Sequence, residues 1–308
     1  MQKPMPSQNI LTNSPDKISL LGSSSRYILG IAAITLFLGI LPSQVHAGGW
    51  TKNVGEYYTK IWLRGLVGSS AFLLEKPTES TGGTYRDFSA NFYTEIGVHE
   101  SITLIAHGTP AGFASFSDDR NSKSTGYMGI LGAGARWGFL KGKLNMALEV
   151  RYGYTSRLGE EAVGKGVARK QPWHYTPVVS SHRFDGELQA GYGFLLGSHG
   201  SGWVTLSAGV AQFTRAKLGT TIIGAAQIGI ALNMGLVFML NFNLFHPLQE
   251  LQEVNVSGAG PTDYAGNGLT ISYWFNKNFA VTASMEAIFY AYSNASTPSL
   301  VLGIELKN

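Results

Sequence analysis

The chain has 308 residues, of which 44% are hydrophobic and only 14% are charged, and its formal net charge is +4. It contains no cysteine, which excludes disulfides, thiolate metal sites and cysteine nucleophiles. The small net charge, without any dense basic run, argues against nucleic-acid binding. Glycine is abundant, at 39 residues, and low charge with much glycine suits a closed sheet whose exterior faces lipid.

The N-terminus has the pattern of a targeting segment. Residues 27–41 are uncharged, follow an arginine and precede a proline, and the run is shorter than the about 20 residues of a transmembrane helix. Val45 and Ala47 supply small residues at the minus-three and minus-one positions of a signal-peptidase site. We therefore predict a signal peptide over residues 1–47 and a mature domain over 48–308, with a signal anchor as the alternative.

The mature sequence alternates between apolar and polar residues. In residues 182–194 the even positions are mostly apolar or small, whereas Arg183, Asp185, Glu187 and Gln189 occupy odd positions. Successive side chains of a strand point to opposite faces, so one face of this strand is apolar and the other is polar. No later apolar run is long enough for a helical span, and a closed barrel is the remaining way to satisfy a backbone in lipid.

The same pattern recurs from residue 55 onward and predicts about twelve strands. They are residues 57–67, 88–98, 102–109, 127–139, 144–154, 182–194, 203–212, 221–233, 236–244, 269–275, 279–290 and 300–307. The connections after even-numbered strands are short. Those after odd-numbered strands are mostly longer, and the longer ones are residues 69–86, 110–126, 155–181 and 246–268. Outer-membrane barrels show this asymmetry between periplasmic turns and outer loops.

Aromatic residues gather at the predicted periplasmic ends of the strands, where an interfacial girdle belongs. They are Tyr57, Trp137, Phe139, Tyr192, Phe194, Tyr273 and Phe275. The predicted fold is an all-β, antiparallel transmembrane β-barrel of about 12 strands, exported to the outer membrane of a Gram-negative bacterium. Its expected partners are outer-membrane lipids, lipopolysaccharide and the barrel-assembly machinery.

Four short motifs, GWT at residues 49–51, GEYY at 55–58, YTEIG at 93–97 and SITL at 101–104, resemble the XagA-like family of Gram-negative outer-membrane barrels. They cover about the first fifth of the mature chain. The resemblance implies an outer-membrane location and no assigned activity. One departure is that the chain ends without the aromatic residue usual in such barrels. Either neighbouring aliphatic residues replace that signal, or the last strand is misplaced.

Motifs for catalysis are weak. Residues 159–165 have the glycine and lysine spacing of a phosphate-binding loop, but glycine follows where serine or threonine would bind magnesium. His199 and Ser201 have the spacing of the histidine–serine pair of outer-membrane phospholipases, yet they fall in a predicted periplasmic turn, and Gly202 follows where that motif has asparagine. The histidines show no metal-ligand spacing. We predict no catalytic residue, no cofactor and no metal, and we keep a lipid hydrolase acting through Ser201 as a third hypothesis.

The polar faces of the predicted strands carry six positive and six negative side chains that point into the lumen. They are Lys60, Arg64, Glu95, Arg136, Glu149, Arg151, Arg183, Asp185, Glu187, Glu286, Glu305 and Lys307. A pore selective for one sign of ion usually has an excess of the opposite charge. A balanced set suits an internal ion-pair network equally well.

Two functional hypotheses follow. The first is a narrow pore or passive transporter for small polar solutes, with current that falls when Arg183 or Glu187 is altered. The second is a non-conducting accessory barrel that presents residues 155–181 and 246–268 to a surface partner or to polysaccharide-export machinery. The larger of these loops carries candidate contacts to a surface ligand or to lipopolysaccharide phosphates. They are Arg169, Lys170, Trp173 and His174.

Overall fold

The computed structural model describes most of the chain after residue 49. The described ranges are 50–73, 76–119, 122–155, 163–165, 172–174, 181–214, 219–249, 254–255, 262–292 and 294–308. The predicted signal peptide, residues 1–47, lies outside the described residues. No helix in the described ranges is long and apolar enough to cross a membrane.

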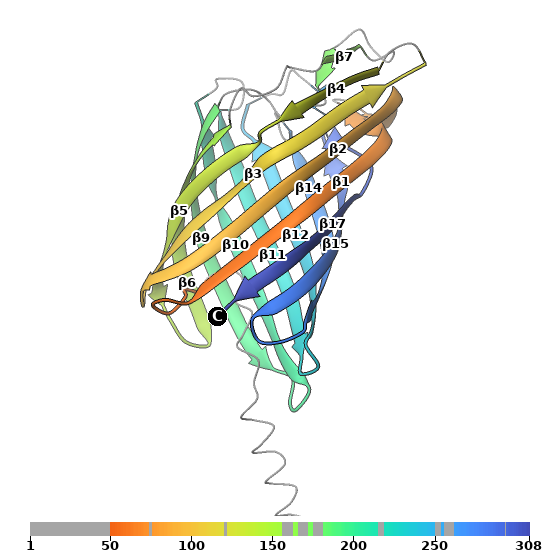
Figure 1. Ribbon diagram of the computed structural model, residues 1–308. Coiled ribbons are helices and arrows are strands. Elements are labelled where there is room, and N and C mark those ends of the chain that lie inside the picture. The colour runs from red at the N-terminus through yellow and green to blue at the C-terminus, as the bar shows by residue number, and fades with distance from the viewer. Residues whose placement is uncertain are drawn as a thin grey trace, which may run out of the picture. The chain divides into compact units, whose positions relative to one another are not determined.

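Twelve antiparallel strands close into a β-barrel, as the alternation predicts (Figure 1). They are β1 (Tyr57–Leu73), β2 (Lys76–His99), β3 (Ile102–Ser117), β5 (Ile130–Leu140), β6 (Leu144–Thr155), β9 (Ser181–Leu195), β10 (Gly200–Phe213), β11 (Thr220–Leu232), β12 (Leu236–Pro247), β14 (Tyr264–Trp274), β15 (Phe279–Ala291) and β17 (Ser299–Lys307). The barrel closes where β17 pairs with β1, from Tyr58 opposite Lys307 to Gly65 opposite Leu300. The predicted last strand is therefore confirmed.

The outer face of the barrel is apolar. On β1, Leu63 is 64% exposed, whereas its neighbour Arg64 points inward and contacts Asp87. At the periplasmic rim, Trp137 packs on Phe139 with 5.7 Å between ring centroids. A closed barrel with an apolar exterior and an aromatic rim has the surface that a bilayer requires.

Two predicted outer connections are wrong, because the strands continue through them. β1 and β2 extend to Leu73 and from Lys76, so residues 69–86 are mostly paired strand. β3 runs to Ser117 and pairs with an extra strand, β4 (Ser122–Tyr127), within the predicted loop 110–126.

Pro110 explains the second error. Proline cannot donate a ladder hydrogen bond, so it indicates the end of a strand. Here it lies at a register shift, where Ala90 opposes Ala111 and Phe92 opposes Gly108. Such a bulge accommodates the residue without ending the strand.

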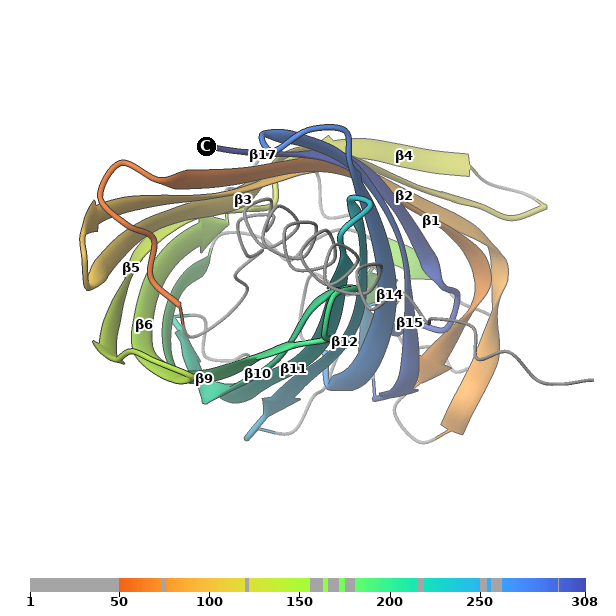
Figure 2. The same ribbon diagram turned by 90° about the horizontal axis from the view of Figure 1, so that it is seen from below.

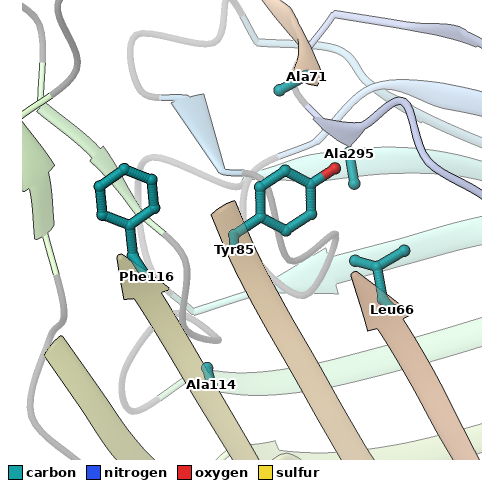
Figure 3. Close-up of a cluster of buried hydrophobic side chains, with 6 residues drawn as sticks. All are labelled: Leu66, Ala71, Tyr85, Ala114, Phe116 and Ala295. Atoms are coloured by element: carbon teal, nitrogen blue, oxygen red, sulfur yellow. The ribbon is translucent and has the colours of Figure 1, made fainter. Parts of the chain in front are cut away.

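The inner side of these extended strands holds a buried apolar cluster (Figure 3). Its members are Leu66, Ala71, Tyr85, Ala114, Phe116 and Ala295. The Tyr85 hydroxyl donates to the carbonyl of Ser70 at 2.7 Å, so the polar tip of the ring is satisfied inside the cluster. The stabilisation gained by burying apolar side chains is roughly proportional to the apolar area removed from water. Burial of this cluster therefore supports the extension of β1, β2 and β3.

Short strands form in the connections at the outer end. β7 (Val163–Lys165), β8 (Pro172–His174) and β13 (Val254–Asn255) make a separate sheet, in which β13 pairs with β8. The two loops that the sequence marks as long therefore meet. β16 (Asn294–Ala295) pairs with the end of β1. Of the candidate loop contacts, Trp173 and His174 lie in β8, whereas Arg169 and Lys170 lie outside the described residues.

The outward face of β9 provides a stability test. Leu188 lies at the centre of the strand and is 48% exposed. Replacing it by arginine should lower the free energy of unfolding by about 2–4 kcal/mol, because arginine is costly at the bilayer midplane. Leu144→Arg, at the periplasmic end of the outward face of the neighbouring strand β6, is the matched control and should cost about 0–1 kcal/mol. Urea unfolding in lipid vesicles measures both, and equal costs would contradict the inferred position of the membrane.

Candidate functional site in the barrel lumen

The lumen contains a continuous series of ion pairs of alternating sign. Lys52 Nζ lies 3.6 Å from Glu95 Oε2, and Glu95 Oε1 lies 2.9 Å from Arg136 Nη1. Arg136 Nη2 in turn lies 2.7 Å from Glu149 Oε2. Arg136 and Glu149 are buried, with 3% and 2% of their surface exposed. A buried charge is costly without a partner of opposite sign, so each of these two groups depends on the other.

The series continues on β6 and β9. The strand register places Glu149 directly opposite Glu187, where two like charges would repel. Arg151 lies between these carboxylates, 3.4 Å from Glu149 Oε1 and also paired with Glu187. It contacts Asp185 at 3.4 Å, and Arg183 bonds Asp185 at 2.6 Å.

We call this set the ion-pair ladder. Its four cations and four anions are Lys52, Glu95, Arg136, Glu149, Arg151, Asp185, Arg183 and Glu187. The ladder lies on the wall made by β2, β3, β5, β6 and β9, and its members come from all of these strands except β3, with Lys52 preceding β1. Each group within the ladder contacts groups of opposite charge on either side. The loss of one member therefore leaves its neighbours as buried charges without a partner.

A second, smaller set of charges lies on the strands around the barrel closure. Lys60 Nζ is 3.7 Å from Glu305 Oε1, which also accepts a hydrogen bond from Ser272 at 2.9 Å. Arg64 Nη1 lies 3.7 Å from Asp87 Oδ2.

Asp87 also links the wall to β4, outside the membrane-spanning strands. The Tyr127 hydroxyl donates to Asp87 Oδ1 at 2.6 Å. Burial, with the carboxylate beside it, raises the pKa of the Tyr127 hydroxyl, so it stays a hydrogen-bond donor.

The opposite wall of the lumen is neutral. β10, β11 and β12 contain no aspartate, glutamate, lysine or arginine. Amides take the place of charges there, and Gln227 accepts from Trp203 Nε1 at 2.8 Å and donates to Asn241 at 2.6 Å. The lumen is therefore asymmetric across its width, with charged groups on one side and uncharged polar and apolar groups on the other.

Residues 50–56, which we call the N-terminal segment, line the periplasmic mouth (Figure 2). Arg136 Nη1 donates to the Trp50 carbonyl at 3.1 Å, and the Lys52 amide donates to Thr103 Oγ1 at 2.8 Å. A side chain at Gly191 would meet the Trp50 ring at 2.6 Å, so this glycine is needed for the close approach. The segment is fixed to the inner wall at several points and narrows the mouth.

An apolar cluster completes the lining of this mouth. Trp203, Ala231, Val237 and Met239 are buried there, and Trp50 and Trp274 pack against them. Lys307 Nζ lies 4.1 Å from the centroid of the Trp274 ring, within the range of a cation–π interaction.

The structure places all ten predicted lumen residues on the inner side of the barrel. They are Lys60, Arg64, Glu95, Arg136, Glu149, Arg151, Arg183, Asp185, Glu187 and Glu286. The sequence reasoning missed Lys52 and Asp87. Asp87 has the same parity as Asn91 and Glu95, so one more period of alternation would have found it. Lys52 precedes the first strand, where no alternation applies.

No chemical centre emerges elsewhere in the described ranges. No hydrogen bond joins His199 to Ser201 there. No group of three or more histidine, aspartate or glutamate side chains in the described part of the chain could hold a metal ion.

Comparisons with known proteins agree with the barrel. No family model matches the chain, and no curated protein matches it significantly. Among solved structures, the chain is similar to an outer membrane channel from Pseudomonas putida F1, with a TM-score of 0.58 and 13% identity over 86% of this chain and 100% of that one. The translocator domain of the autotransporter NalP from Neisseria meningitidis has a TM-score of 0.44 at 13% identity, over 94% of this chain and 99% of that one. The KdgM porin has a TM-score of 0.43 at 6% identity, over 80% and 98%.

The likeness to the Pseudomonas putida channel shows the fold. The protein has the fold of outer-membrane β-barrels. The resemblance to the XagA-like family stays a prediction.

Removal of Arg136 tests the ladder. Arg136→Met should lower the free energy of unfolding by about 3–5 kcal/mol, because it leaves Glu95 and Glu149 buried without their central partner. Adding Glu95→Gln and Glu149→Gln to the same chain should recover part of that loss. Arg183→Met, at the more exposed end, is the control and should cost less. Urea unfolding in vesicles measures all three, and no recovery in the triple variant would contradict the ion-pair explanation.

Proposed function

We propose that the protein is a narrow outer-membrane pore for small polar solutes. The observation that carries this proposal is the polar inner surface of the barrel. The ion-pair ladder lies on one wall, and the amides of Gln227 and Asn241 lie on the other. A polar interior is typical of barrels with a water-filled channel, so this lining favours a hydrated lumen.

The balance of charge supports a solute that is polar rather than an ion of one sign. The ion-pair ladder has as many cations as anions, so it leaves no net field that would select one sign. The neutral wall of β10, β11 and β12 faces this charged wall. A solute in the lumen thus meets charged groups on one side and amide, hydroxyl and aromatic groups on the other.

The accessory-barrel alternative is favoured by one observation. The N-terminal segment and the tryptophan-rich cluster narrow the same mouth, and a mouth that stays shut would make the barrel silent. The sheet of β7, β8 and β13 would then be the surface through which the barrel acts. No contact among the described residues favours the lipid hydrolase.

Single-channel recording in a planar bilayer tests the pore. The folded protein should give stable conductance steps with weak ion preference. Glu187→Gln should shift the preference toward anions, and Arg183→Gln should shift it toward cations, since each removes one lumen charge. A folded barrel without steps would favour the accessory role.

The N-terminal segment provides a second test of the same function. Deleting residues 50–53 should raise the conductance of each step, because it removes Trp50 and Lys52 from the narrowed mouth. Thr51→Ala, which removes one hydrogen bond to the Glu100 carbonyl, is the control and should leave the conductance near that of the parent. An unchanged conductance in the deletion would place the constriction elsewhere.

A further inference from the structure

A cavity on the inner side of the barrel holds polar groups that the ion-pair ladder does not use. Its volume is about 240 Å³, below the about 300–1,000 Å³ of clefts for drug-sized ligands. It lies between β1, β12, β14 and β15 and the residues that lead into β17. Its polar lining includes Arg64, Asn243, Tyr264 and Glu286. Its size suits a small metabolite.

The two charged groups of this cavity keep free hydrogen-bonding capacity. Among the described residues, Arg64 forms one ion pair, with Asp87 at 3.7 Å, so most of its five N–H donors have no partner there. Glu286 accepts one hydrogen bond, from Ser299 Oγ to Oε2 at 3.3 Å, and its side chain is exposed to the lumen. Among the described residues, Arg64 and Glu286 form no ion pair with each other.

The neutral groups are also available. The side-chain amide of Asn243 and the hydroxyl of Tyr264 make no hydrogen bond to the described residues, while the Tyr264 ring is held by stacking on Phe245, with 5.9 Å between centroids. The absence of a side chain at Gly268 leaves space for Glu286, since a Cβ atom at this position would lie 3.3 Å from Glu286 Cγ. The aliphatic part of Glu286 therefore lies beside Gly268 of β14, and its Oε2 is within hydrogen-bond distance of Ser299 on β17.

The separation of the two charges defines what could bridge them. β17 lies between β1 and β15, and Arg64 is opposite Val301 of β17 whereas Glu286 is opposite Ser299. Two strand spacings of about 4.8 Å each, together with an offset of two residues along the strands, therefore separate the two backbones. Side chains that reach inward from these strands leave room for a small molecule between the guanidinium and the carboxylate. The cavity lining carries one cation, Arg64, and one anion, Glu286, so a simple anion would be repelled by Glu286 and a simple cation by Arg64.

We propose that this cavity binds a small zwitterionic amino compound, an α-amino acid, with its carboxylate on Arg64 and its ammonium group on Glu286. Guanidinium binds carboxylate in a bidentate manner, and a carboxylate accepts charge-assisted hydrogen bonds from ammonium. Asn243 and Tyr264 supply further hydrogen bonds. The inference rests on the proposed function, because it names the class of solute that the pore would pass.

Equilibrium dialysis with radiolabelled L-alanine tests the site on the protein purified from membranes in detergent. Binding should saturate, and propionate or ethylammonium should compete at least about tenfold more weakly, because each makes only one of the two charge-assisted contacts. Glu286→Gln should weaken L-alanine binding by about tenfold or more for the same reason. Glu100→Gln, an exposed carboxylate in a periplasmic turn, is the matched control and should bind like the parent.

Arg64 needs a conservative variant, because its loss leaves the carboxylate of Asp87 buried beside Tyr127 alone. Arg64→Lys keeps the positive charge but loses the bidentate geometry, so it should fold and bind L-alanine more weakly. The proposal is overturned by an absence of saturable binding, by propionate competing as well as L-alanine, or by full binding in Glu286→Gln.

Bilayer recording of the same preparation separates this inference from the pore itself. Saturable L-alanine binding to a barrel that carries no current would support the site and overturn the pore. Clear conductance steps without saturable L-alanine binding would support the pore and overturn the site.

Discussion

The interior of a bilayer offers the backbone no hydrogen bonds, and this constraint governs the rest of the structure. The sheet has to close, which it does through eight register pairs between β1 and β17. Closure gives every strand a lipid side and a lumen side, and successive side chains alternate between the two. Charged residues within the strands therefore face the lumen. Once inside, those charges are held in a restricted space and have to find partners.

Arg136 shows how this requirement joins distant parts of the chain. Its guanidinium contacts Glu95 on β2 and Glu149 on β6, and it donates to the carbonyl of Trp50. The group that neutralises two buried carboxylates therefore also fixes the N-terminal segment at the periplasmic mouth. The stability of the charged wall and the width of that mouth thus depend on the same side chain.

The sequence was sufficient for the number of barrel strands and for the parity of the inward residues, because both follow from local alternation. It was insufficient where tertiary packing overrode a local pattern. The extension of β1 and β2 depends on a cluster formed with Phe116 and Ala295, residues far apart in the chain. From the sequence alone, Pro110 predicted the end of a strand. The bulge that accommodates it forms only in the pairing of β3 with β2, which the sequence does not show.

The pairing of the inward charges could not be read from the sequence either. Alternation predicts that Glu149 and Glu187 point inward, but only the register between β6 and β9 places them opposite each other with Arg151 between. Lys52 belongs to no strand and enters the ladder only because the N-terminal segment folds back into the barrel. Composition and parity thus define the set of lumen charges, whereas register defines the network.

A network that neutralises itself also limits how the lumen can discriminate. Because the ladder satisfies its own charges, it contributes little net potential, and the neutral wall opposite contributes none. In the pore that we propose, discrimination among solutes has to come from groups that keep hydrogen-bonding capacity among the described residues. Arg64, Asn243, Tyr264 and Glu286 are such groups, and they line one cavity. In this barrel the paired charges maintain the lumen, and the incompletely paired ones are available to recognise what enters it.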